Sequence, residues 1–198
     1  MAEKKPARGR PRDPALRRKI IAAAAALLDE GGITAVTMEA VAAKAGVGKP
    51  TLYREWPNAQ ALAMAAFLET TRAQKPRTGK TRPLDALREQ LRAIARGFST
   101  RSGRNTAMMI AAAQHDSELA KVFRNRFIIA RREEGRTLLT RAIAAGALRA
   151  DTDTDLALDL IYAPLYFRLL IGHGPLDAAF TDAILDAALK GLGNPRKR

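Results

Sequence analysis

The stretch from residue 36 to residue 56 limits the possible folds of this chain more than any other feature. Its sequence is VTMEAVAAKAGVGKPTLYREW. The pattern predicts two short helices joined by a tight turn at Ala45-Gly46-Val47, because glycine adopts turn conformations that other residues resist. The second helix is too short and too polar to belong to a core. This arrangement is typical of a helix-turn-helix, in which one helix crosses the DNA backbone and the next enters the major groove.

The overall charge of the chain agrees with a nucleic-acid partner. Its 198 residues include 34 lysines and arginines against 20 acidic residues, which leaves a formal net charge of +14. Double-stranded DNA is therefore the expected partner, with an unrelated basic protein as the alternative. The absence of cysteine excludes disulfides and thiolate metal sites. It also agrees with a reducing cytoplasm, which is where we expect the protein to reside.

The beginning of the chain superficially resembles a signal peptide, since basic residues precede an apolar run from Ile20 to Leu28. That run continues directly into Asp29-Glu30-Gly31-Gly32, without a clear cleavage segment. Asp13 is a good helix cap, and Pro14 suits the first helical position. We therefore predict a helix over residues 14–30. No apolar run approaches the roughly 20 residues of a membrane helix, so no membrane partner is expected.

Helical signals continue over the rest of the chain, and its alanine-rich, aromatic-poor composition suits packed helices. One helix is predicted after Pro57-Asn58, and others near residues 84–98, 105–114, 117–145, 154–171 and 176–192. The predicted fold is all-α with about nine helices. The predicted segments are a disordered basic arm (1–12), a helix-turn-helix domain (13–73), a linker (74–83), a helical C-terminal domain (84–193) and a basic tail (194–198).

The second helix of the helix-turn-helix supplies the candidate DNA contacts. Lysine or arginine can donate to guanine or phosphate, a tyrosine hydroxyl can donate to phosphate, and proline can pack on a thymine methyl. The candidates are Lys49, Pro50, Thr51, Tyr53 and Arg54, with Thr37 and Lys44 as weaker phosphate contacts. The alternative is a solvated helix face with Tyr53 partly in the core. For Trp56 we prefer the core position, and we expect Glu55 to face a lysine or arginine.

The N-terminal arm contains Arg8, Arg10 and Arg12 within the motif Arg-Gly-Arg-Pro-Arg. This motif resembles an AT-hook, an extended basic segment that lies in the minor groove. Narrow A·T minor grooves concentrate negative potential and attract arginine. The alternative is a basic tail that adds only non-specific affinity. Removal of residues 1–12 is expected to lower DNA affinity and to flatten its salt dependence.

No catalytic or metal site is predicted. Residues 48–51 lack the adjacent lysine and threonine of a phosphate-binding loop. Residues 151–155 begin like a calcium loop, but Leu156 and Tyr162 occupy positions that need glycine and glutamate. His115 and His173 have no partners at catalytic or metal-ligand spacing. The chain is therefore predicted not to be an enzyme and to need no cofactor.

The chain resembles the tetracycline-repressor (TetR) family of bacterial transcription regulators. The resemblance rests on the apolar pattern of residues 20–28, on Gly31-Gly32 and Thr37-Met38, and above all on the consecutive residues 48–57. Residues 142–153 and 164–170 also resemble later parts of the family. Two positions depart from it. Gly48 stands where a serine or threonine often caps the recognition helix, and Ala59 stands where a lysine usually meets a phosphate.

The resemblance implies a homodimer whose C-terminal domain binds a small molecule that releases the DNA. We expect a largely apolar or aromatic ligand, and the candidate pocket residues are Ile94, Phe98, Met108, Met109, Phe123, Phe127, Tyr162 and Tyr166. An ordinary core would use the same residues. The candidate dimer residues on the last two helices are Leu169, Ile184, Ala187 and Ala188, with packing inside one chain as the alternative. A two-fold dimer predicts a palindromic site.

The function predicted from the sequence is a homodimeric, sequence-specific transcriptional regulator. We expect a repressor that leaves its palindromic operator when a small molecule binds. The first alternative is an architectural or ligand-independent DNA-binding protein that contacts DNA mainly through its basic arm. The second alternative is a helical small-molecule-binding protein whose DNA-binding head is vestigial.

Overall fold

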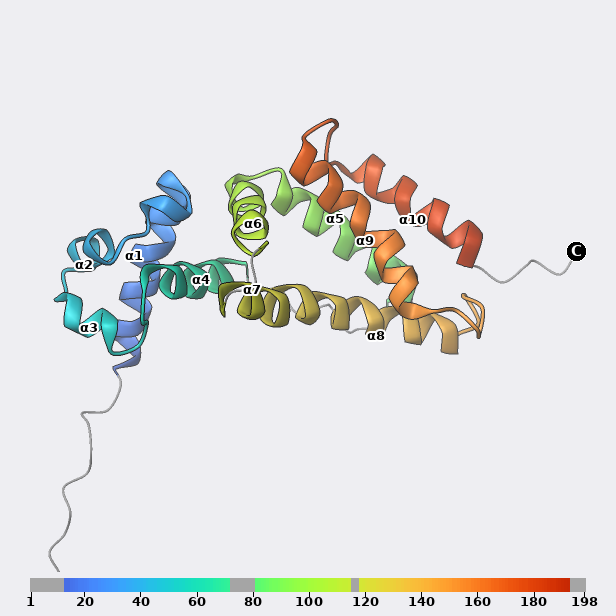
Figure 1. Ribbon diagram of the computed structural model, residues 1–198. Helices are drawn as coiled ribbons and strands as arrows, with labels where there is room; N and C mark the ends of the chain where they lie inside the picture. The colour runs from blue at the N-terminus through green and yellow to red at the C-terminus, as the bar shows by residue number, and fades with distance from the viewer. Residues whose placement is uncertain (1–12, 72–80, 115–117, 193–198) are drawn as a thin grey trace, which may run out of the picture.

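The computed structural model describes residues 13–71, 81–114 and 118–192 (Figure 1). Local capping groups set the limits of its first helix. Helix α1 spans Pro14–Gly31, and the Asp13 carboxylate accepts hydrogen bonds from the amides of Ala15 and Leu16. Gly32 follows with a φ of 72°, which ends the helix. The predicted first helix is therefore confirmed. Its buried face consists of Ile20, Ile21, Ala23, Ala24 and Leu28.

Three short helices complete the N-terminal head, by which we mean α1–α4. A 3-10 turn, η1 (Ile33–Ala35), leads to α2 (Met38–Ala45), α3 (Lys49–Tyr53) and α4 (Ala59–Thr70). In Figure 1, α2 and α3 lie at one end of the molecule, and α4 extends from them toward the remaining helices. Any rearrangement of the C-terminal helices that moves α4 would therefore also act on the head.

The C-terminal part consists of longer helices. They are α5 (Pro83–Phe98), α6 (Arg101–Ala112), α7 (Glu118–Phe123), α8 (Ala130–Ala144), α9 (Thr154–Ile171) and α10 (Ala178–Leu192). A π-helical turn, η2 (Arg124–Ile129), joins α7 to α8 into one long helix. Counted in this way, the described residues contain nine helices and no strand, as predicted. None of these helices is both long and apolar enough to cross a membrane.

Two helix starts and one internal turn differ from the prediction. The helix predicted at 105–114 begins at Arg101, because the Thr100 hydroxyl caps it by accepting from the Ser102 amide at 3.2 Å. The last helix begins at Ala178 rather than at residue 176, where Asp177 caps it through the Phe180 amide. The long helix predicted at 117–145 is present, but its π-helical turn was not foreseen.

An apolar core joins the head to the C-terminal helices. It contains side chains of α1–α4 together with Met109, Phe123 and Phe127. The ring of Phe67 in α4 lies 4.9 Å from that of Phe127 and 6.0 Å from that of Phe123, measured between centroids. The predicted domain limits remain a prediction, since most of the predicted linker 74–83 lies outside the described residues. The predicted arm (1–12) and tail (194–198) lie outside them as well.

A second core lies among α5, α8, α9 and α10, and ion pairs border it. Arg92 of α5 contacts Asp182 of α10 at 2.6 Å. Arg136 and Arg132 of α8 contact Asp155 of α9 at 2.6 and 2.9 Å. Because these groups are partly or largely exposed, each pair adds little stability and mainly orients neighbouring helices.

The carboxylate of Asp155 provides a pH test of this packing. Hydrogen bonds from Arg136 and then Arg132 lower its pKa from 3.8 to about 2. The stability that follows from this shift is complete above the unfolded value of 3.8, and it is lost as the pH falls toward 2. We expect carboxyl-carbon NMR to give Asp155 a midpoint near the lower value, and Arg136→Gln to raise it. A midpoint of 3.8 in the unchanged protein would show that the pairs do not form in solution.

Candidate DNA-binding interface

Two buried side chains hold the short helix α3 in place and leave the rest of its surface in solvent. Leu52 is fully buried, and Trp56, just beyond the helix, is 5% exposed. The core position predicted for Trp56 is therefore confirmed, whereas Tyr53 is 53% exposed. The predicted DNA-contact residues on the outer surface are Lys49, Pro50, Tyr53 and Arg54, all exposed, with Thr51 half-buried beside them.

The turn between α2 and α3 has the geometry that its glycine predicts. Gly46 lies in the left-handed region with φ 61° and ψ 43°, and its N–H donates to the carbonyls of Ala42 and Ala43. Thr37 caps α2, because its hydroxyl accepts from the Ala40 amide at 3.0 Å. Thr37 is nevertheless exposed and lies at the N-terminus of α2, where backbone amides favour an anion.

Acidic side chains of the head pair with both candidate lysines. The Nζ atom of Lys49 lies 2.9 Å from Glu39, and that of Lys44 lies 2.8 Å from Glu30. The hydrogen bond raises the pKa of Lys49 and lowers the pKa of Glu39. A phosphate must therefore compete with the Glu39 carboxylate for the Lys49 ammonium. Both pairs are exposed to solvent, so this exchange costs little.

The substitution Glu39→Gln is expected to tighten DNA binding several-fold at low salt. It frees Lys49 and removes a negative charge beside this candidate DNA contact, so the slope of log affinity against log salt should steepen by up to about 0.9. The matched control is Glu118→Gln, which breaks a similar exposed pair with Lys121 on α7 at 3.0 Å. Fluorescence anisotropy over a salt series measures the DNA affinity of both variants. Equal affinities and equal salt slopes for the two would show that Glu39 does not restrain Lys49.

Arg17 of α1 contacts two residues just beyond the end of α3. Its Nε donates to the Glu55 carboxylate, and its guanidinium carbon lies 5.7 Å from the centroid of the Trp56 ring. The expectation that Glu55 faces an arginine is confirmed. The orientation of α3 is therefore set by α1 as well as by α2.

The two departures from the family pattern have local consequences. Gly48 is the N-cap of α3 and makes no side-chain hydrogen bond to it. The side chain of Asn58 caps α4 by accepting from the Ala61 amide at 2.8 Å, and Ala59 adds no side-chain donor. Gly48 therefore offers no side-chain hydroxyl, and Ala59 no ammonium group, to a phosphate at these helix starts. The predicted arm residues Arg8, Arg10 and Arg12 lie outside the described residues.

The predicted pocket residues divide between the two cores. Met109, Phe123 and Phe127 belong to the first core, Tyr162 to the second, and Tyr166 packs against both. Ile94 and Phe98 are half-buried against the second core, and the half-buried Met108 lies near Gly32. Their role as a ligand pocket stays a prediction.

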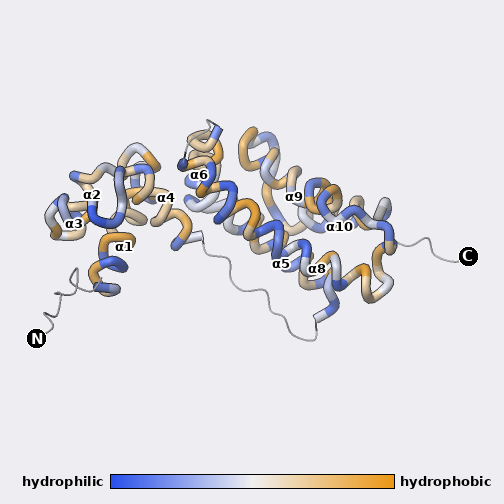
Figure 2. Tube along the Cα trace, turned by 60° about the horizontal axis from the view of Figure 1, so that its bottom comes forward, coloured by the Kyte–Doolittle hydropathy of each residue, from blue (hydrophilic) through white to orange (hydrophobic). Residues whose placement is uncertain are grey.

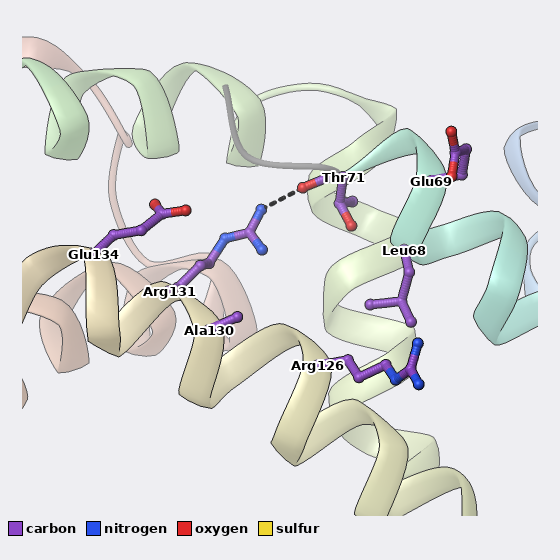
Figure 3. A pocket seen from close by; sticks show the side chains of 7 residues that line it. All are labelled: Leu68, Glu69, Thr71, Arg126, Ala130, Arg131 and Glu134. Carbon is purple, nitrogen blue, oxygen red and sulfur yellow. Dashed lines mark hydrogen bonds between the residues drawn. The ribbon is translucent and has the colours of Figure 1, made fainter. Parts of the chain in front are cut away.

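A hollow of about 340 Å³ lies close to these residues but has a different lining (Figure 3). We call it the α4–α8 hollow. Its lining residues are Leu68, Glu69, Thr71, Arg126, Ala130, Arg131 and Glu134. Sequence reasoning missed them because no local pattern connects Thr71 with Arg131, which is 60 residues away.

The predicted dimer residues lie on helices that expose apolar surface. Ala187 is exposed, Leu169 is half-buried, and Ile184 and Ala188 pack partly against the second core. Sequence reasoning missed the large exposed side chains of α9, which are Leu156, Leu160, Phe167, Leu170 and Ile171. Their spacing places them on one face of α9, a helix that is largely apolar in Figure 2. The signal that could have found them is the large number of apolar residues in α9, more than one buried face needs.

Matches to known proteins cover both parts of the chain. Residues 20–66 match the family model of bacterial regulatory proteins of the tetR family. Residues 75–188 match the model of the tetracyclin repressor-like C-terminal domain. The chain belongs to the tetracycline-repressor family. This TetR-family protein is therefore a helix-turn-helix, DNA-binding transcription regulator and not an enzyme.

Several relatives match over nearly their whole length. An uncharacterized helix-turn-helix transcriptional regulator of Bacillus subtilis, YdeS, is 36% identical over 187 residues and covers 93% of each chain. A DNA-binding transcriptional repressor TetR of Mycobacteroides abscessus is 30% identical over 200 residues, with 97% of this chain and 99% of that protein covered. The crystal structure of the TetR family transcription regulator SCO0332 is 36% identical, with a TM-score of 0.72 over 90% of this chain and 99% of that one.

Proposed function

We propose that this TetR-family regulator is a homodimeric repressor that binds a palindromic operator and leaves it when a small molecule binds among the C-terminal helices. The observation that carries the proposal is the outer surface of α3, which is exposed and basic while Leu52 and Trp56 anchor the helix. The relative named as a DNA-binding transcriptional repressor supports repression. The Flavonoid-responsive Regulator FrrA, 25% identical with a TM-score of 0.65, supports control by a small molecule.

In this proposal α3 enters the major groove. Lys49 and Arg54 donate to guanine or phosphate, Tyr53 donates its hydroxyl to a phosphate, and Pro50 and Thr51 pack against bases. Thr37 and Lys44 meet phosphates from the start and end of α2. The basic arm adds minor-groove or non-specific contacts through Arg8, Arg10 and Arg12.

A second copy of the chain covers the exposed apolar face of α9. Large contiguous apolar patches are rare on monomeric proteins, and the small side chains of Ala187 and Ala188 on α10 allow helices to approach closely. The side chains of Phe167 and Leu160 are 59% and 50% exposed in one copy. Pairing these faces about a two-fold axis gives two α3 helices, each for one half-site of the operator.

Selection of duplex DNA from a random library, by the full-length protein at physiological salt, tests the proposal. We expect a two-fold symmetric consensus with half-site centres about one turn of DNA, or a multiple of a turn, apart. Salt-sensitive binding without a consensus would favour the architectural alternative and would contradict the repressor. The selected duplex then becomes the probe in a screen for compounds that release the protein.

A further inference from the structure

The α4–α8 hollow has the size and position of a small-molecule site. Its volume of about 340 Å³ lies at the lower end of the range of roughly 300–1,000 Å³ that is usual for ligand pockets. One wall is the last turn of α4, which belongs to the head, and the other is η2 with the start of α8 (Figure 3). A molecule in the hollow would therefore touch the head and the C-terminal helices together.

Arg131 brings a positive charge into the hollow, and no carboxylate of the described residues forms a close ion pair with it. Its Nη2 donates to the main-chain carbonyl of Thr71 at 2.7 Å, and its guanidinium lies 4.0 Å from the centroid of the Phe127 ring. No ion pair of Arg131 is present among the described residues, whereas Arg132 and Arg136 on the same helix both pair with Asp155. Burial lowers the pKa of Arg131, as expected for a charge without a close counter-ion.

Glu134 of the lining attracts the guanidinium of Arg131 electrostatically but forms no hydrogen bond with it. Glu134 accepts a hydrogen bond of 3.1 Å from Gln90, whose amide oxygen in turn accepts from the Tyr162 hydroxyl at 2.9 Å. Figure 3 shows the side chain of Glu69 on the far side of α4, directed away from Arg131. Arg126 of η2 is exposed and extends toward α4 in the same view, so it adds a second cation at the opening.

The lining also offers an apolar surface beside the guanidinium. Leu68 and Ala130 face the hollow, and the ring of Phe127 lies beneath Arg131. A planar guanidinium holds a carboxylate through two parallel hydrogen bonds, which are stronger than its single bond to a neutral carbonyl. The combination fits a molecule with an apolar body and one carboxylate.

We propose that the α4–α8 hollow binds an apolar carboxylic acid. Its carboxylate replaces the carbonyl of Thr71 as the acceptor of hydrogen bonds from the guanidinium of Arg131. Thr71 is the C-cap of α4, so the ligand changes how the last turn of α4 is held. The consequence for DNA rests on the proposed function, in which a ligand releases the operator. The chemical class of the ligand rests only on the hollow.

Calorimetric titration of the full-length protein tests the ligand class. The probes are hexanoate, octanoate, decanoate, benzoate and 2-naphthoate, each compared with its primary amide. We expect at least one carboxylate to bind, its amide to bind at least about tenfold more weakly, and Arg131→Gln to lose at least about tenfold in affinity. Arg131→Lys should retain part of the affinity. Arg124→Gln, which changes an exposed arginine of η2 outside the lining, is the matched control and should bind as the unchanged protein does.

Thermal unfolding without ligand confirms that each variant is folded before the titration. Equal binding of an acid and its amide, full affinity in a folded Arg131→Gln protein, or no binding by any of the five acids would overturn the proposal. Operator binding separates this inference from the proposed function. An acid that binds through Arg131 and leaves operator affinity unchanged supports the ligand class and contradicts ligand control. Release by a neutral compound, equally strong in Arg131→Gln, supports ligand control and overturns the carboxylate assignment.

Discussion

The substitution Gly103→Ala is expected to lower the free energy of unfolding by about 3 kcal/mol or more, one of the two largest effects in this protein. A Cβ atom at Gly103 would lie 1.9 Å from the carbonyl oxygen of Phe98 and 2.5 Å from its carbonyl carbon. These are backbone atoms of the corner between α5 and α6, so no side-chain rotation relieves the contact. The corner must open, and α6 then shifts against α1 and α5.

Gly97→Ala is the matched control for Gly103→Ala. Gly97 lies in the last turn of α5, and a Cβ atom there would meet nothing within 4 Å. Because alanine favours the helix over glycine, we expect a gain of about 0.5 kcal/mol or more. Urea unfolding followed by circular dichroism measures both variants. Equal stabilities for the two would show that the corner is looser than its backbone contact implies.

The double substitution Leu160→Glu with Phe167→Glu is expected to convert the proposed dimer into a folded monomer. It places two carboxylates in the middle of the exposed apolar face of α9, where a second copy would have to bury them unpaired. Operator affinity should fall by about 100-fold or more, because the second half-site no longer binds as part of the same molecule. Sedimentation velocity and operator titration measure the two effects.

The control for the α9 variant is Ile129→Glu. Ile129 is also a large apolar residue, 49% exposed, but it lies on η2 and not on α9. The Ile129→Glu variant should leave both the sedimentation coefficient and the operator affinity unchanged. A double variant that still sediments as a dimer would contradict the α9 interface, and the predicted residues Ile184, Ala187 and Ala188 of α10 would then be changed in the same way.

The helix-turn-helix and most helix limits follow from residues close together in the chain. Asp13, Thr37 and Gly46 act on backbone groups within four residues of themselves, so their caps and turn are visible in a short window of sequence. The burial of Leu52 and the exposure of Tyr53 in the next position follow from the same helical periodicity. The buried and exposed sides of α3 could therefore be predicted from neighbouring residues.

The contacts between distant segments depend on long-range packing and could not be predicted from the sequence. The tilted ring contact of Phe67 with Phe127, the pairing of Lys49 with Glu39 and the hydrogen bond from Arg131 to Thr71 join elements that have no common local pattern. The same holds for the face of α9 that remains exposed, because apolar residues spread over most of a helix do not reveal which side its own chain will cover. Local hydrogen bonds and periodicity are encoded in neighbouring residues, whereas these contacts depend on how whole helices pack against one another.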